Sequence, residues 1–190
     1  MKTIIDDMAA NEQSISETTI NSYLNALRRI FVVEDLPAWS PALRSKTAIR
    51  LTAKRHFVDP SIAVTALRTA PEGLLADFNT FGLLFESICV RDIRIYAQAN
   101  DGDVYHYRDK SDFEADIIVA LHDGRWGGAI EVKMGEKEID MAAANLLKLK
   151  NEVNVEKMHE PSFLMVLTAS EYCYQREDGV YVIPVGCLRE

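Results

Sequence analysis

Cysteine is scarce in this sequence. Among its 190 residues are three cysteines, Cys89, Cys173 and Cys187, which lie far apart, and no C-x-x-C pair occurs. An odd and scattered set of this kind argues against a disulfide framework and against a thiolate zinc site. The cysteine pattern therefore predicts a protein of a reducing compartment, and we expect it to be cytoplasmic.

Long apolar runs are also missing. No segment approaches the roughly 20 consecutive apolar residues that a membrane-spanning helix needs, so we expect no membrane partner. The first residues, MKTIIDDM, reach two aspartates after a few apolar positions, which is not the pattern of a secretory signal peptide. A G-x-x-x-x-G-K-[ST] phosphate-binding loop is absent as well, so we expect no ATPase activity from this chain.

Charge is distributed unevenly along the chain. The net charge of −8 argues against a protein whose whole surface wraps nucleic acid. Residues 1–75 contain nine Lys and Arg against eight Asp and Glu, whereas the remainder contains twelve against twenty-one. This difference, together with a Pro- and Gly-containing break at residues 69–73, predicts two modules, residues 1–72 and 73–190.

The first module has the pattern of a helix followed by a basic strand or hairpin. A capping box at Ser14–Glu17 precedes an apolar stripe at helical spacing, and residues 49–58 are long enough for a strand or hairpin. Trp39, in a connector with two prolines, is expected to anchor that connector to the core. The order is the outline of a winged helix-turn-helix, and its candidate DNA contacts are Asn21, Asn25, Arg44, Lys46, Arg50, Lys54 and Arg55. A solvated helix face is the alternative explanation for Asn21 and Asn25.

The second module alternates helices and strands. Apolar periodicity predicts a helix over residues 74–94 and another over about 137–151. Strands are predicted at residues 104–108, 117–121, 126–132, 163–167 and 180–184. The resulting order is αβββαβ with a terminal hairpin. The predicted fold class is α/β, of the mixed α+β kind, with a mixed sheet flanked by helices behind the winged-helix segment.

Acidic residues and a lysine interrupt two of the predicted apolar strands. Asp116 opens one, and Glu131 and Lys133 close the next, sharing a face because strand side chains alternate. If the strands are neighbours, Asp116 and Glu131 can both reach one Mg²⁺ (or Mn²⁺), which would activate water at a phosphodiester. Glu86, inside the wide apolar stripe of the preceding helix, is a further candidate. The alternative is an exposed pair of opposite charges on the sheet.

The spacing of these residues is similar to that of the PD-(D/E)xK nuclease superfamily, because Glu131-Val132-Lys133 follows Asp116 by fifteen positions. Over roughly residues 14–185 the chain also resembles the C-terminal region of a widespread group of prokaryotic AAA-type ATPases. In that group a domain of unknown function follows the ATPase module, and its Glu-Val-Asp motif corresponds to Glu114-Ala115-Asp116 here. The resemblance lies in residues 15–27, 36–39, 55–63 and 107–133.

The resemblance implies a winged helix followed by a restriction-endonuclease-like domain. It implies Glu86, Asp116, Glu131 and Lys133 as catalytic residues, with Asp116 and Glu131 as ligands of Mg²⁺. Its implied partners are DNA and the ATPase domain of a parent protein, or another protein. Two functions follow: a divalent-metal-dependent nuclease, or a catalytically inactive DNA- or protein-binding module that serves an ATPase.

Overall fold

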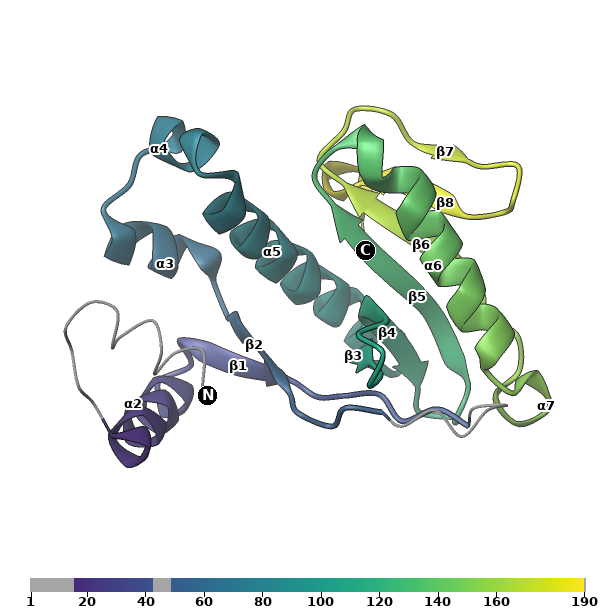
Figure 1. Cartoon of the computed structure of the whole chain (residues 1–190), viewed down its shortest axis with the longest axis horizontal. Coiled ribbons are helices and arrows are strands. Elements are labelled where there is room, and N and C mark those ends of the chain that lie inside the picture. Colours follow the sequence, from purple (N-terminus) through teal and green to yellow (C-terminus); the bar gives the residue numbers. More distant parts are fainter. Residues whose placement is uncertain (1–15, 43–48, 190) are drawn as a thin grey trace.

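A six-stranded mixed sheet with one long helix against each face is the largest feature of the molecule (Figure 1). The computed structural model describes residues 16–42 and 49–189. The strands run in the order β3-β4-β5-β6-β8-β7. This architecture confirms the predicted class, a mixed α+β fold with helices flanking a mixed sheet.

The sheet combines antiparallel and parallel pairs. The first three strands form an antiparallel meander, while β5 and β6 are parallel and are joined through the helix α6. Strand β8 is parallel to β6, and β7 and β8 form the predicted terminal hairpin. The bounds are β3 Gly102–Arg108, β4 Glu114–Leu121, β5 Trp126–Lys133, β6 Phe163–Thr168, β7 Tyr174–Gln175 and β8 Tyr181–Pro184.

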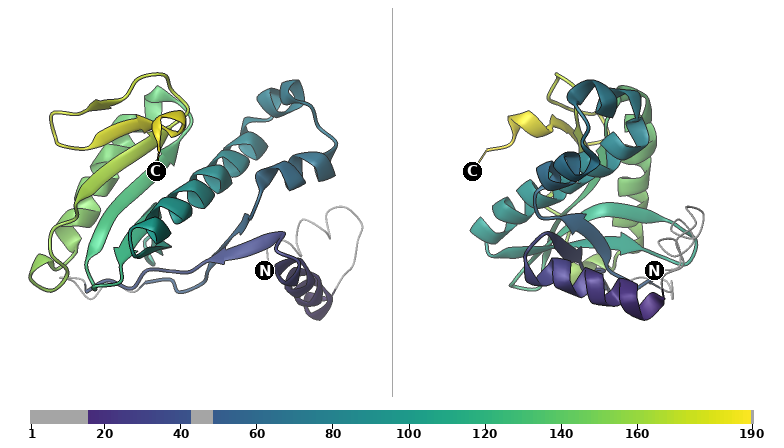
Figure 2. Two further views of the ribbon diagram at one scale, coloured as in Figure 1. Left: turned by 180° about the vertical axis from the view of Figure 1, so that it is seen from behind. Right: turned by 90° about the vertical axis from the view of Figure 1, so that its left-hand side faces the viewer.

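Two apolar cores hold the long helices to the sheet. Helix α5 (Phe78–Ala99) packs on one face, where Cys89 and Val90 are fully buried with Ile117 of β4. Helix α6 (Ile139–Glu152) covers the other face through residues that include Leu146. The views in Figures 1 and 2 agree that α5 and α6 lie on opposite sides of β5. Each helix is held by the apolar stripe that its sequence spacing predicts.

The helix predicted over residues 74–94 is divided in two. Helix α4 (Pro71–Ala76) ends before Asp77, and α5 begins at Phe78 and continues to Ala99. The side chain of Asp77 accepts a hydrogen bond from the backbone N–H of Thr80, and its own backbone is not helical. Asp77 is therefore an N-cap, and an aspartate at this position starts a new helix instead of continuing the old one.

Within the described residues, the first segment (residues 1–72) contains, before α4, the elements α2 Glu17–Arg29, β1 Val33–Leu36, β2 Lys54–Phe57 and α3 Pro60–Leu67. Strands β1 and β2 pair antiparallel, and within the described residues one helix precedes them. Ser16 is the N-cap of α2, whereas Ser14 of the predicted capping box lies outside the described residues. The winged helix-turn-helix stays a prediction.

The apolar stripe of α2 is mostly exposed, although a stripe of this kind usually faces the core of a globular protein. Ile20 is buried, but Tyr23, Leu27, Ile30 and Phe31 are exposed. The reason is the position of α2, which contacts β1 and lies at one end of the molecule, away from α6 (Figure 1).

The connector after β1 joins the first segment to the sheet. As predicted, Trp39 is buried in the core under α6, and its ring stacks on that of Trp126 with centroids 5.2 Å apart. The backbone N–H of Trp39 donates to the carbonyl of His106 on β3 at 2.7 Å. The described connector of the first segment therefore shares a core with the sheet, and the division into two modules stays a prediction.

Short elements complete the described chain: the 3₁₀ turns η1 (Glu136–Glu138) and η2 (Val185–Cys187) and the helix α7 (Val155–Met158). Among the helices that the structure describes, none combines the length and apolar composition needed to cross a membrane.

Candidate active site

Strand β4 is irregular where Asp116 lies. Its register against β3 shifts between Tyr105 and Tyr107, because β4 contributes one extra residue there. A bulge of this kind re-aims the neighbouring side chains. Ile117 packs in the core under α5, whereas Ile118 packs in the core under α6. The bulge thereby gives Asp116 access to groups from the α5 side of the sheet.

Asp116 lies where β4 and β5 separate. Their ladder ends at the pair Ile117–Ile130, and beyond it the Oδ2 atom of Asp116 accepts a hydrogen bond of 2.9 Å from the backbone N–H of Val132. The side chain is buried. Its Oδ2 atom lies 3.7 Å from the Nζ of Lys133, and its Oδ1 atom lies 3.4 Å from the Nζ of Lys54. Asp116 is thus the carboxylate that links two lysines.

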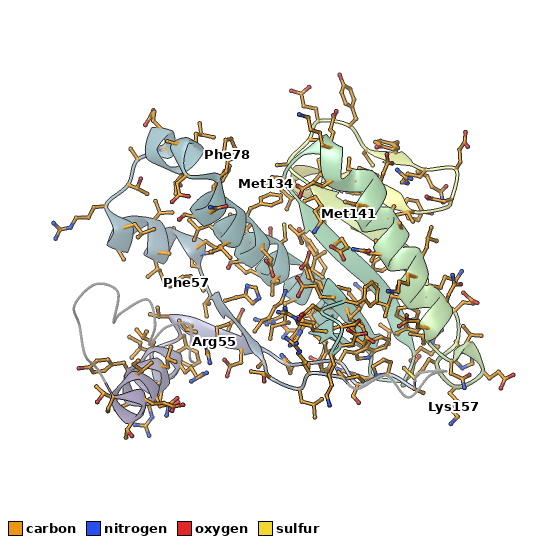
Figure 3. All side chains as sticks on the ribbon, viewed as in Figure 1. Arg55, Phe57, Phe78, Met134, Met141 and Lys157 are labelled. Carbon is orange, nitrogen blue, oxygen red and sulfur yellow. The ribbon has the colours of Figure 1, made fainter. Side chains whose placement is uncertain are left out.

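Glu131 and Lys133 meet Asp116 as the sequence predicts. The Nζ of Lys133 lies 2.8 Å from Oε2 of Glu131, so one ammonium contacts both carboxylates. Glu131 is 2% exposed, and its Oε1 has no hydrogen-bond partner in the part of the chain that the structure describes. Met134, the residue after Lys133, packs with the core under α5 (Figure 3). This is expected, because successive side chains of an extended segment point to opposite faces.

Glu86 reaches the cluster through a lysine that the sequence analysis had assigned to DNA. The Nζ of Lys54, on β2, lies 3.3 Å from Oε1 of Glu86 and 3.4 Å from Oδ1 of Asp116. Lys54 therefore points into the protein, between two carboxylates from α5 and β4. We call these five residues the charged cluster: Lys54, Glu86, Asp116, Glu131 and Lys133.

His56 is a second contributor from β2 that the sequence analysis missed. Its Nδ1 lies 3.2 Å from the hydroxyl of Ser87, and its Nε2 lies 4.0 Å from Oε1 of Glu86. Burial, together with the nearby charge of Lys54, lowers the pKa of His56 to about 4, so the ring is neutral at pH 7. The available signal was the alternation of Lys54 and His56, which places both on one face of a short strand.

Burial and like charge shift Glu86 and Glu131 toward their protonated forms. Burial, and then the charge of Asp116, raise the pKa of Glu131 to about 7 against the opposing effect of Lys133. The same two causes raise the pKa of Glu86 against Lys54. For the lysines, burial lowers the pKa, but the neighbouring carboxylates outweigh it and the pKa of each is raised. Both lysines therefore remain charged at neutral pH.

The remaining candidate DNA contacts are dispersed. Asn21 and Asn25 are exposed on α2, Arg50 pairs with Asp112 at 2.9 Å, and Arg55 (labelled in Figure 3) lies beside Lys54 on β2. Arg44 and Lys46 lie outside the described residues. Among those described, Lys54 is the member of the set that reaches the charged cluster.

The donor set determines which metal the site can hold. Within residues 16–42 and 49–189, no group of three or more His, Cys, Asp or Glu side chains is placed where it could hold a metal ion. Mg²⁺ does not need such a group, because it is usually bound through one or two carboxylates and keeps several waters. Asp116 and Glu131, with the unpartnered Oε1 of Glu131, fit that requirement.

Comparison with known families divides the chain near residue 75. Residues 2–73 match a domain of unknown function, DUF8612, and residues 81–188 match another, DUF4143. Searches of curated proteins and of solved structures found no match. The charged cluster draws on both matched segments, since Lys54 belongs to the first and the other four residues to the second. The second match covers more than half of the chain, and the chain belongs to the DUF4143 family.

Proposed function

We propose that the charged cluster is the active site of a divalent-metal-dependent nuclease-like domain. The observation that carries the proposal is the convergence of two buried carboxylates, Asp116 and Glu131, on the single ammonium of Lys133. Removing charged groups from water costs free energy. These groups lie where β4 and β5 separate, beyond the last residue pair of their ladder. An arrangement of this cost is expected where chemistry requires it.

Each residue has a role that follows from its position. Asp116 and Glu131 would hold Mg²⁺ or Mn²⁺, which supplies polarisation of a phosphoryl oxygen and a more acidic bound water. Burial and the charge of Asp116 raise the pKa of Glu131 to about 7 in the metal-free protein, and a divalent ion bound there would favour its ionised form. Lys133 keeps a positive charge beside both carboxylates, where it can stabilise negative charge on a phosphoryl group.

The order of elements supports a restriction-endonuclease-like fold. Helix α5, the antiparallel strands β3, β4 and β5, the crossover helix α6 and the parallel strand β6 follow the αβββαβ order implied by the resemblance. The resemblance to the C-terminal region of AAA-type ATPases also supports an ATPase, in the same parent chain or in another protein, as a partner. Catalysis of ATP hydrolysis is not part of the proposal.

Nucleic acid is the substrate class that the first segment supports. A depression of about 600 Å³ on α2 is lined by polar and basic side chains that include Asn25 and Arg29. Amide and guanidinium groups of this kind contact phosphates and base edges. Binding through phosphates would weaken as salt concentration rises, because counterions are released.

The ion pairs made by the ammoniums of Lys54 and Lys133 favour a second candidate function. Lys54 and Lys133 already pair with the three acids of the cluster, so two of the three carboxylate charges are compensated without a metal ion. In that case the chain is a catalytically inactive DNA- or protein-binding module that serves an ATPase.

Cleavage of single-stranded and duplex DNA and of RNA, measured with Mg²⁺, with Mn²⁺ and with EDTA, separates the two candidates. The nuclease proposal expects cleavage that requires the metal and that falls by about 100-fold or more in Asp116→Asn. Asp123→Asn is the matched control, because Asp123 lies in the exposed turn between β4 and β5 and pairs with Arg125. Nucleic-acid binding without cleavage under any of these conditions, unchanged by Asp116→Asn, would support the inactive module instead.

A further inference from the structure

We infer that Lys54 is a resident cation of the charged cluster that competes with divalent metal and sets the metal affinity of the site. The inference rests on the proposed function and assigns to the DUF8612-matching segment a direct part in the site of the DUF4143 domain. Lys54 is neither a metal ligand nor a DNA contact in this view; it is a positioning residue that acts on Glu86 and Asp116.

The geometry places the ammonium of Lys54 where positive charge is most favourable. Its Nζ lies 3.3 Å from Oε1 of Glu86 and 3.4 Å from Oδ1 of Asp116, and no more than a quarter of each of these three side chains is exposed. Lys133 contacts the other oxygen of Asp116. The two carboxylate oxygens of Asp116 therefore face two different ammoniums, one from each matched segment.

A divalent ion and an ammonium cannot both stay close to the same carboxylate without repulsion. Between two charges in contact near a protein surface, the Coulomb energy is large enough to change an association constant by an order of magnitude or more. Metal bound at Asp116 must therefore displace the Lys54 ammonium or tolerate its charge. Either way, Lys54 lowers metal affinity, and the same interaction stabilises the metal-free protein.

Lys54 is also distant in the sequence from the carboxylate of Asp116 that it contacts. It lies sixty-two positions before Asp116, on a strand that pairs with β1 and not with the six-stranded sheet. Figure 3 marks Arg55 next to it on β2, below α5. The neighbouring His56 of the same strand is buried beside Ser87 of α5, which holds β2 next to the cluster. The first segment therefore supplies one of the two ammoniums that face Asp116.

Calorimetric titration of the full chain with MnCl₂ and MgCl₂ tests the inference directly. Lys54→Met keeps an unbranched side chain one atom shorter and removes its charge, and we expect it to bind Mn²⁺ roughly tenfold or more tightly than the wild type. Thermal unfolding gives a second readout: the metal-free variant melts below the wild type, and saturating Mn²⁺ raises its melting temperature by a larger amount. Lys110→Met, at an exposed lysine, serves as the control and keeps wild-type affinity.

If Lys54→Met alone does not fold, a variant that also removes the charge of Glu86 keeps the test valid. The double variant Lys54→Met/Glu86→Gln removes one charge of each sign, and we expect it to bind Mn²⁺ more tightly than Glu86→Gln alone. Equal or weaker Mn²⁺ affinity after loss of Lys54, in either background, overturns the inference, even where the wild type binds metal and cleaves nucleic acid. Absence of metal binding in every variant overturns the proposed nuclease function as well.

Discussion

Helix α5 passes two depressions of opposite character. Near Glu86 it borders the charged cluster and a pocket of about 430 Å³ that also contains Arg108 and Glu114. Farther along, the same helix lines a pocket of about 370 Å³ whose walls are mostly apolar, with Ile93 and Val119 among them. Both depressions are formed by α5 with neighbouring strands, yet one buries charges and the other buries hydrocarbon.

The contrast shows what stability alone requires of this fold. At the apolar end, α5 is held to the sheet by burial of aliphatic and aromatic side chains, which contributes about 25 cal/mol per Å² of area removed from water. At the charged end, desolvation of carboxylates and ammoniums offsets most of their mutual attraction. Apolar burial therefore accounts for the attachment of α5 at the apolar end, whereas the proposed function would account for the charges buried at the other end.

Lys133→Met should have the largest effect on this contrast, because it leaves Glu131 and Asp116 without their shared cation. We expect a loss of about 3–5 kcal/mol in unfolding free energy at about pH 8. The loss should be smaller at about pH 5, where Glu131, with its pKa raised further by removal of Lys133, is protonated. Urea denaturation at both pH values measures it. A loss that is the same at the two pH values would show that Lys133 acts through packing and not through charge.

Glu131→Gln should remove a pH dependence of the wild type. Burial and Asp116 raise the pKa of Glu131 from 4.5 to about 7, so its contribution to stability is complete below pH 4.5 and is lost as pH rises through 7. The wild type should therefore lose on the order of 3 kcal/mol from this group across that interval. Denaturation profiles of the variant should lack this decrease. An unchanged profile would place the titration on another group, such as Glu86.

Val119→Ala probes the apolar end and should have the smallest effect of the three. Val119 is buried on β4 and lines the apolar pocket. Removal of two methyl groups should cost about 2 kcal/mol through lost burial and a small cavity. The cost should be the same across the pH range and with or without Mg²⁺. A dependence on Mg²⁺ would mean that the two ends of α5 are coupled, contrary to the comparison.

Much of the fold follows from local patterns. The αβββαβ order, the terminal hairpin and the burial of Trp39 were predicted correctly, because apolar periodicity reports directly which face of an element is covered. The break at Asp77 in the helix predicted over residues 74–94 was missed. An aspartate at such a position can cap a new helix, but it can also lie exposed on the surface of a continuous helix, and the sequence pattern is the same in both cases. The exposed stripe of α2 was missed because periodicity shows that a face is apolar, not that another element covers it.

By itself the sequence determined that Glu131 and Lys133 share one face of a strand, because side chains alternate along it. Their contacts with Asp116 also depend on the bulge in β4 and on the point where β4 and β5 separate, which only the tertiary structure decided. Only the tertiary structure decided that Lys54 joins them and that Glu86 is reached through it. That contact joins a separate two-stranded sheet to a bulge in β4, and no local pattern links residues sixty-two positions apart. The basic tract of the sequence predicted a DNA-binding surface. In the folded protein one of its lysines, Lys54, points inward, where its ammonium compensates the charges of two carboxylates that are largely removed from water.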